Sequence, residues 1–99
     1  MKDINEKEFV AAIKEGTVLV DFNADWCGPC QMMRPILEKF AEKHQDVKVY
    51  GINIDAHEDL ADAYEVSTIP CVVLFKDGKE VARTVGVQAL PKLEKFVGV

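Results

Sequence analysis

The sequence has little of what marks a membrane, extracellular or nucleic-acid-binding protein. No apolar run approaches the roughly 20 residues of a membrane-spanning helix. The first eight residues are polar and lack the apolar core of a secretion signal, so we expect a cytoplasmic protein. Three cysteines are too few for a disulfide scaffold. The 12 Lys and Arg against 17 Asp and Glu give a net charge of −5, which argues against nucleic acid or an anionic membrane as a partner.

The chain also lacks signs of a second domain. It has 99 residues, no internal repeat and no Pro- or Ser-rich linker, which predicts one domain over residues 1–99. Hydrophobic residues make up 48% and charged residues 29% of the chain, which is typical of a folded globular domain. A single hydrophobic core is therefore expected.

Hydrophobic periodicity predicts alternating helices and strands. Helices are expected over residues 5–16, 28–44, 57–64 and 90–97, and strands over 17–22, 47–54, 71–75 and 80–85. Asn5 and Glu8 have the spacing of a helix-capping pair, and Pro35 is expected to kink the second helix. Asp77-Gly78 predicts a hairpin turn between the last two strands. This order predicts an α/β fold with a central mixed sheet flanked by helices on both faces.

The strongest motif is Trp26-Cys27-Gly28-Pro29-Cys30, between a predicted strand and a predicted helix. Two cysteines three residues apart at a helix start lie close enough for a disulfide. The helix N-terminus directs unpaired N–H groups at the first sulfur, which stabilises its thiolate and lowers the pKa of Cys27. We expect Cys27 to be exposed and nucleophilic, and Cys30 to be buried and to resolve the mixed disulfide.

Other uses of a cysteine pair fit the sequence poorly. A zinc ribbon needs a second ligand pair, and Cys71, His44 and His57 have unsuitable spacing. Haem attachment needs a His directly after the second cysteine, where Gln31 stands. Redox chemistry without a metal is therefore the favoured interpretation of the pair.

The segment from Val20 to Cys30 resembles the active-site segment of the thioredoxin family. Further similar features are Pro35, Asn53-Ile54-Asp55, Ile69-Pro70, Phe75-Lys76-Asp77-Gly78 and Gly86. The resemblance implies a thioredoxin fold and a protein-disulfide reductase, an oxidoreductase that passes two electrons to protein substrates and is recharged by a thioredoxin reductase. No bound cofactor is needed, because the two cysteines carry the electrons. We expect a monomer with no nucleic-acid or membrane partner.

The resemblance also implies roles for residues around the motif. A lone Asp near a strand end is more often solvated or hydrogen-bonded, but the resemblance makes Asp21 a buried carboxyl beneath Cys30. Burial raises its pKa, so that it can accept the proton of Cys30. The Ile69–Pro70 bond is implied to be cis, although trans bonds are far commoner. The implied active-site loop and substrate-binding surface comprise Trp26, Gly28, Pro29, Ile69, Pro70 and Gly86.

Three positions depart from the family pattern. Asn23 stands where an aromatic residue is common, which is expected to thin the packing beneath the active-site loop. Gly51 stands where a Lys often neighbours the buried Asp, so desolvation is expected to raise the pKa of Asp21 further. Cys71 stands where Thr is common. It is either an inert small hydrophobe, or a modulator that captures a mixed disulfide, alters the potential or joins the pair as a soft-metal ligand.

Two other functions are compatible with the motif. An oxidase or isomerase would have the same fold with a more oxidising cysteine pair, although Gly28-Pro29 and the absence of a secretion signal speak against it. A binding subunit would use the surface around Trp26 and Ile69 without turnover.

Overall fold

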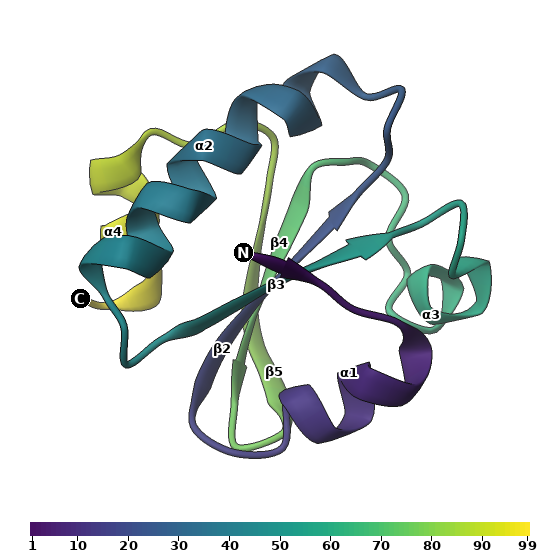
Figure 1. The fold of residues 1–99 in the computed structure, drawn as a ribbon, viewed down its shortest axis with the longest axis horizontal. Helices are drawn as coiled ribbons and strands as arrows, with labels where there is room; N and C mark the ends of the chain where they lie inside the picture. The colour runs from purple at the N-terminus through teal and green to yellow at the C-terminus, as the bar shows by residue number, and fades with distance from the viewer.

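A five-stranded mixed sheet forms the middle layer of the molecule, with helices on both faces (Figure 1). The computed structural model describes residues 1–99. The elements are β1 (Lys2–Asp3), α1 (Glu6–Ala12), β2 (Thr17–Asn23), α2 (Gly28–Lys43), β3 (Lys48–Asn53), α3 (Glu58–Ala63), β4 (Cys71–Lys76), β5 (Lys79–Val85) and α4 (Leu90–Val97). The strand order is β1-β3-β2-β4-β5, in which β1, β3 and β2 are parallel and β4 and β5 are antiparallel to their neighbours. The predicted α/β fold is confirmed.

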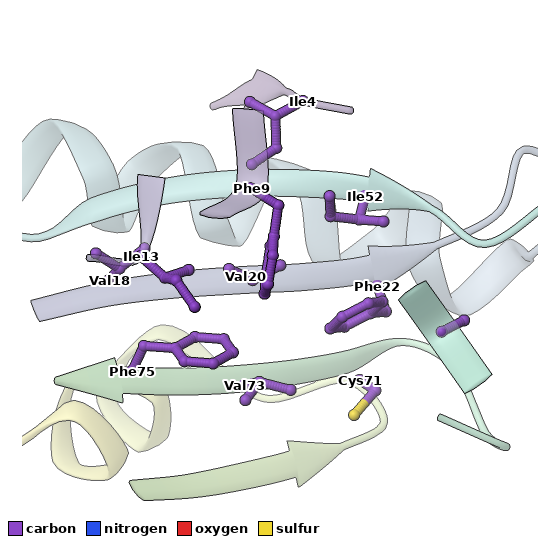
Figure 2. Close-up of a cluster of buried hydrophobic side chains, with 11 residues drawn as sticks. Ile4, Phe9, Ile13, Val18, Val20, Phe22, Ile52, Cys71, Val73 and Phe75 are labelled. Atoms are coloured by element: carbon purple, nitrogen blue, oxygen red, sulfur yellow. The ribbon is translucent and has the colours of Figure 1, made fainter. Parts of the chain in front are cut away.

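The central strand β2 is buried on both faces because its apolar residues alternate between two cores. Val18, Val20 and Phe22 pack toward α1 and α3, in the cluster shown in Figure 2. Leu19 points the other way, into a second cluster with residues of α2 and α4. Asp21 therefore shares the α2 face of the sheet with Leu19, and it is the only charged residue of the chain that is buried.

Local sequence signals account for most element boundaries. The Asn5 side chain accepts from the Glu8 backbone N–H at 2.8 Å while the Glu8 carboxylate accepts from the Asn5 N–H at 3.1 Å, which confirms the predicted capping pair at α1. Asp77 and Gly78 have φ angles of 50° and 87°, as a tight hairpin requires, and β4 and β5 pair antiparallel.

Two expectations about the elements need correction. The first element is a strand and not a helix: β1 pairs with Tyr50 and Gly51 of β3. A two-residue strand has too little periodicity to be recognised from sequence, and only the neighbouring strand stabilises it. The first helix also ends earlier than expected, because the chain leaves the helical conformation after Ile13.

The helix α2 continues through Pro35 to Lys43. None of the helices has the length and apolar character needed to cross a membrane.

Candidate active site

A disulfide joins Cys27 and Cys30 at the start of α2, with their Cα atoms 5.2 Å apart. The buried run of β2 ends at Asn23, and Cys27 is the N-cap of the helix that follows. Pro29 occupies the first turn, where a missing backbone N–H breaks no helical hydrogen bond. The cysteine pair therefore lies at the N-terminus of the helix that follows β2.

The two sulfurs differ in their hydrogen bonding and not in their exposure. The backbone N–H of Cys30 donates to the Cys27 Sγ at 3.2 Å, so the helix N-terminus faces the first sulfur as expected. The expectation of an exposed Cys27 is not met in this disulfide form, since Cys27 is 5% and Cys30 4% exposed. The reason is long-range packing, because Ile54 and Ile69 lie against the pair.

The Ile69–Pro70 bond is cis, as the resemblance implied. The Ile69 carbonyl oxygen lies 4.0 Å from the Cys27 Sγ, so this loop borders the disulfide. The Pro70 carbonyl accepts from the Gly86 N–H at 2.9 Å, which ties the start of β4 to the end of β5. The Ile69 N–H makes no hydrogen bond within the chain, whereas Pro70 itself is buried. The Ile69 N–H is therefore free to pair with another chain beside the disulfide.

Trp26 is the most exposed large side chain beside the disulfide, at 69%. Its indole Nε1–H donates to the Asp55 Oδ2 at 2.7 Å, which holds the ring in place despite that exposure. The sequence analysis named Asp55 only as part of a family feature and did not predict its bond to Trp26. The position of Asp55 just after a strand was the available signal, and nothing local pointed to Trp26. In the structure the Asp55 backbone N–H donates to the Asn53 Oδ1 at 2.8 Å.

Asp21 lies in a cleft of about 190 Å³ that reaches Cys30. The cleft is lined by Asp21, Asn23, Ala24, Asp25, Cys30, Gln31 and Arg34. Asp21 is 1% exposed, and its Oδ1 has no hydrogen-bond partner in the chain. Desolvation by burial raises the pKa of Asp21 from 3.8 to about 7, against the lowering effects of the Asn23 amide and the Arg34 charge. A carboxyl group with this pKa can take up and release a proton near neutral pH.

The Asn23 side chain is hydrogen-bonded to Asp21. Its Nδ2 donates to the Asp21 carbonyl oxygen at 2.9 Å and to the Asp21 Oδ2 at 3.3 Å. At a position where an aromatic ring is common in the family, the Asn23 amide therefore forms a hydrogen bond that favours the carboxylate form of Asp21. Gly51 pairs with Asp21 across β2 and β3 and brings no charge to it, consistent with the expected rise in the pKa of Asp21.

Cys71 lies on the opposite face of the sheet from Asp21. It pairs with Phe22 and joins the core between the sheet and the helices α1 and α3 (Figure 2). It is a free thiol, 1% exposed, and burial raises its pKa. Cys71 is not part of the cluster around the disulfide. This position favours the interpretation of Cys71 as an inert small hydrophobe.

Replacing Cys71 by alanine is accordingly expected to change stability and not redox chemistry. Loss of one buried sulfur should lower the free energy of unfolding by about 1 kcal/mol. The reduction potential of the Cys27–Cys30 pair and the rate of disulfide reduction should match those of the unchanged protein. A redox titration and a urea unfolding curve measure both effects. A changed potential in a folded Cys71→Ala variant would show that Cys71 modulates the pair.

Comparisons with known proteins identify the family of the chain. The family model for thioredoxin matches residues 1–98. The thioredoxin of Chlamydia pneumoniae is 51% identical over 88 residues, which cover 89% of this chain and 86% of that protein. The solved structure of a mutant thioredoxin from Halobacterium salinarum has a TM-score of 0.91 and 39% identity, covering 98% of this chain and 86% of the other. A mitochondrial thioredoxin 3 from Saccharomyces cerevisiae, in its oxidised form, has a TM-score of 0.90 and 35% identity, covering 99% and 93%.

Proposed function

This chain belongs to the thioredoxin family, and from that membership we propose that it reduces disulfides in other proteins and is recharged by a thioredoxin reductase. It is a dithiol/disulfide oxidoreductase that uses Cys27 and Cys30. The observation that carries the proposed role of Cys27 as the attacking thiol is the hydrogen bond from the Cys30 N–H to the Cys27 sulfur. This bond favours negative charge on Cys27, and the thiolate is the form that attacks a substrate disulfide.

In the first step, the Cys27 thiolate attacks one sulfur of the substrate disulfide. A bond forms between Cys27 and that sulfur, and the substrate S–S bond breaks. The second substrate sulfur leaves as a thiolate and takes a proton from water. The product is a mixed disulfide between Cys27 and the substrate.

In the second step, Cys30 resolves this mixed disulfide. The Asp21 carboxylate takes the proton of the Cys30 thiol, either directly or through water in the cleft that both residues line. The Cys30 thiolate attacks the Cys27 sulfur, the Cys27–Cys30 bond forms, and the remaining substrate sulfur leaves reduced. Two electrons have then passed from the dithiol to the substrate.

The substrate-binding surface in this proposal surrounds the disulfide. Trp26, Gly28 and Pro29 are exposed on one side of it, and Ile69 and Gly86 are partly exposed on the other. An extended substrate segment would pair with the free backbone N–H of Ile69. Pro70 supports this loop from beneath, because it is buried. A surface with few charges suits many substrates.

The proposed partners follow from family membership, and the proposed compartment follows from the chemistry. A thioredoxin reductase and proteins with disulfides are the partners that family membership implies. We place the chain in the cytoplasm, because reduction of protein disulfides needs a compartment that is kept reducing. We also propose that it acts as a monomer. Because one similar protein is a mitochondrial thioredoxin, membership of the family is compatible with the mitochondrion as well as the cytoplasm.

Reduction of insulin by the dithiol form tests the proposed function. The protein should reduce insulin catalytically when it is coupled to an NADPH-dependent or a ferredoxin-dependent thioredoxin reductase, and the productive coupling identifies the electron source. A Cys27→Ser plus Cys30→Ser variant should be inactive. An oxidase or isomerase is instead expected to have a potential in a glutathione titration near or above about −180 mV. That potential, or no insulin reduction with either reductase, would contradict the proposal.

A further inference from the structure

A row of residues crosses three strands next to the disulfide. Asp3 of β1 pairs with Gly51 of β3, and Gly51 pairs with Asp21 of β2. Residues directly opposite one another in paired strands point to the same face of the sheet. Asp3 and Asp21 therefore both project toward α2, on either side of a glycine.

Gly51 lets the Asp3 side chain lie over the middle of this row. A Cβ atom at residue 51 would be 2.5 Å from the Asp3 Oδ1 and 3.3 Å from the Asn23 Nδ2. The space beside Asp21 that a side chain would fill is thus taken by the carboxylate of Asp3 and the amide of Asn23. Any larger residue at position 51 would have to displace Asp3.

Arg34 of α2 binds the Asp3 carboxylate at this point. Its Nη2 lies 3.0 Å from the Asp3 Oδ2 and its Nη1 3.4 Å from the Asp3 Oδ1, a two-pronged contact. Its Nε lies 3.4 Å from the Glu38 Oε1. The two carboxylates fix the guanidinium at the cleft that Asp21 and Cys30 line, and Arg34 itself forms part of the cleft wall.

Arg34 is the only cation among the groups that face Asp21. The groups are Asp3 from β1, Arg34 and Cys30 from α2, Asp25 from the loop after β2, the Asn23 amide from β2 itself, and the uncharged Gly51 of β3 and Val72 of β4. The charge of Arg34 lowers the pKa of Asp21, whereas that of Asp3 raises it. Burial and Asp3 both favour neutral Asp21, and the Asn23 amide and Arg34 oppose them.

We propose that Arg34 is a positioning residue of the exchange reaction: held by Asp3 at the cleft, it maintains enough ionised Asp21 to take the proton from Cys30 near neutral pH. The proposal rests on the proposed role of Asp21 in the second step. Asp21–COO⁻ and Cys30–SH become Asp21–COOH and Cys30–S⁻, and Arg34 neither gains nor loses a proton. Without Arg34, less Asp21 carboxylate is present at pH 7, and resolution of the mixed disulfide slows.

Titration of the Asp21 carboxyl carbon by NMR in four proteins tests the proposal. In Arg34→Met the pKa of Asp21 should rise by about half a pH unit or more. In Arg34→Lys, which keeps the charge, it should stay close to that of the unchanged protein. Arg83→Met is the matched control, because Arg83 is the chain's other arginine and is likewise paired with a carboxylate, Glu80, but points to the opposite face of the sheet. It should leave the pKa of Asp21 unchanged.

Ellman's reagent separates the two exchange steps in the same proteins. Attack by Cys27 releases the first thionitrobenzoate, and resolution by Cys30 releases the second. The pH midpoint of the second release should move upward in Arg34→Met and not in Arg34→Lys or Arg83→Met. If Arg34→Met does not fold, Arg34→Gln takes its place, since its amide can still donate to Asp3.

Three results would overturn the proposal: an Asp21 pKa that does not respond to loss of Arg34, an equal response in Arg83→Met, or a shifted titration with an unshifted second release. Failure of the proposed function is a separate result. It is seen as a lack of insulin reduction by the unchanged protein, whereas the carboxyl titration needs no activity at all.

Discussion

Replacing Cys30 by serine is expected to stop the protein after its first exchange, with the substrate held on Cys27 through a disulfide. Cys27 keeps its N-cap position and can still attack, but a serine hydroxyl at position 30 is too weak a nucleophile to displace the substrate. Reduction of insulin should fall by about 1,000-fold or more. Mass spectrometry under non-reducing conditions should show a covalent complex that dithiothreitol releases.

Cys27→Ser is the matched control for this trap. It removes the attacking sulfur, so it should give no covalent complex and no insulin reduction. The trapped complex also tests Cys71, because that thiol faces the other side of the sheet and should not resolve it. Turnover by a Cys30→Ser protein that disappears when Cys71 is also replaced would contradict the assigned roles.

Replacing Asp21 by asparagine is expected to stabilise the protein at alkaline pH and to slow its chemistry. The pKa of Asp21 is about 7 in the folded chain, above its ordinary value of 3.8, so the folded state binds more protons between these values. The stability that this group contributes is fully present below about pH 4 and is lost as the pH rises through about 7. The difference between these two pKa values corresponds to about 4 kcal/mol of folding free energy. The Asp21→Asn protein does not lose this stability at pH 9, because asparagine does not titrate.

Urea unfolding of the oxidised proteins at pH 5 and pH 9 measures this effect. The stability gain of Asp21→Asn over the unchanged protein should be about 3 kcal/mol larger at pH 9 than at pH 5, because about two pH units separate pH 5 from the pKa of Asp21. Resolution of the mixed disulfide at pH 7 should slow by about 100-fold, since the proton acceptor is gone. Asp25→Asn is the control, because Asp25 lines the same cleft but is exposed. An Asp21→Asn protein with no extra gain at pH 9 would contradict a buried, neutral-titrating carboxyl.

The features that the sequence predicted are those with local causes. The cap at Asn5, the turn at Asp77-Gly78 and the disulfide of Cys27 and Cys30 each depend on residues at most three positions apart. The side of the sheet that Cys71 faces could also have been inferred, since strand alternation puts it with Val73 and Phe75.

The features that the sequence did not predict depend on contacts between distant segments. Trp26 meets Asp55 across 29 positions, and Arg34 meets Asp3 across 31. The burial of Cys27 needs Ile69, which is supplied by the loop before β4. These residues come into contact only in the folded chain, where the parallel strands are in register and α2 is packed over them.

Alkylation of the reduced protein as a function of pH tests the central claim most directly. Iodoacetamide labelling followed by peptide mass spectrometry gives a separate reaction profile for each thiol. The helix N-terminus and the Cys30 N–H should make Cys27 react first, with a midpoint well below the value of about 8.5 for a free cysteine, while Cys30 stays largely unlabelled. Equal labelling of Cys27 and Cys30, both with midpoints near 8.5, would contradict the division of work between the two sulfurs.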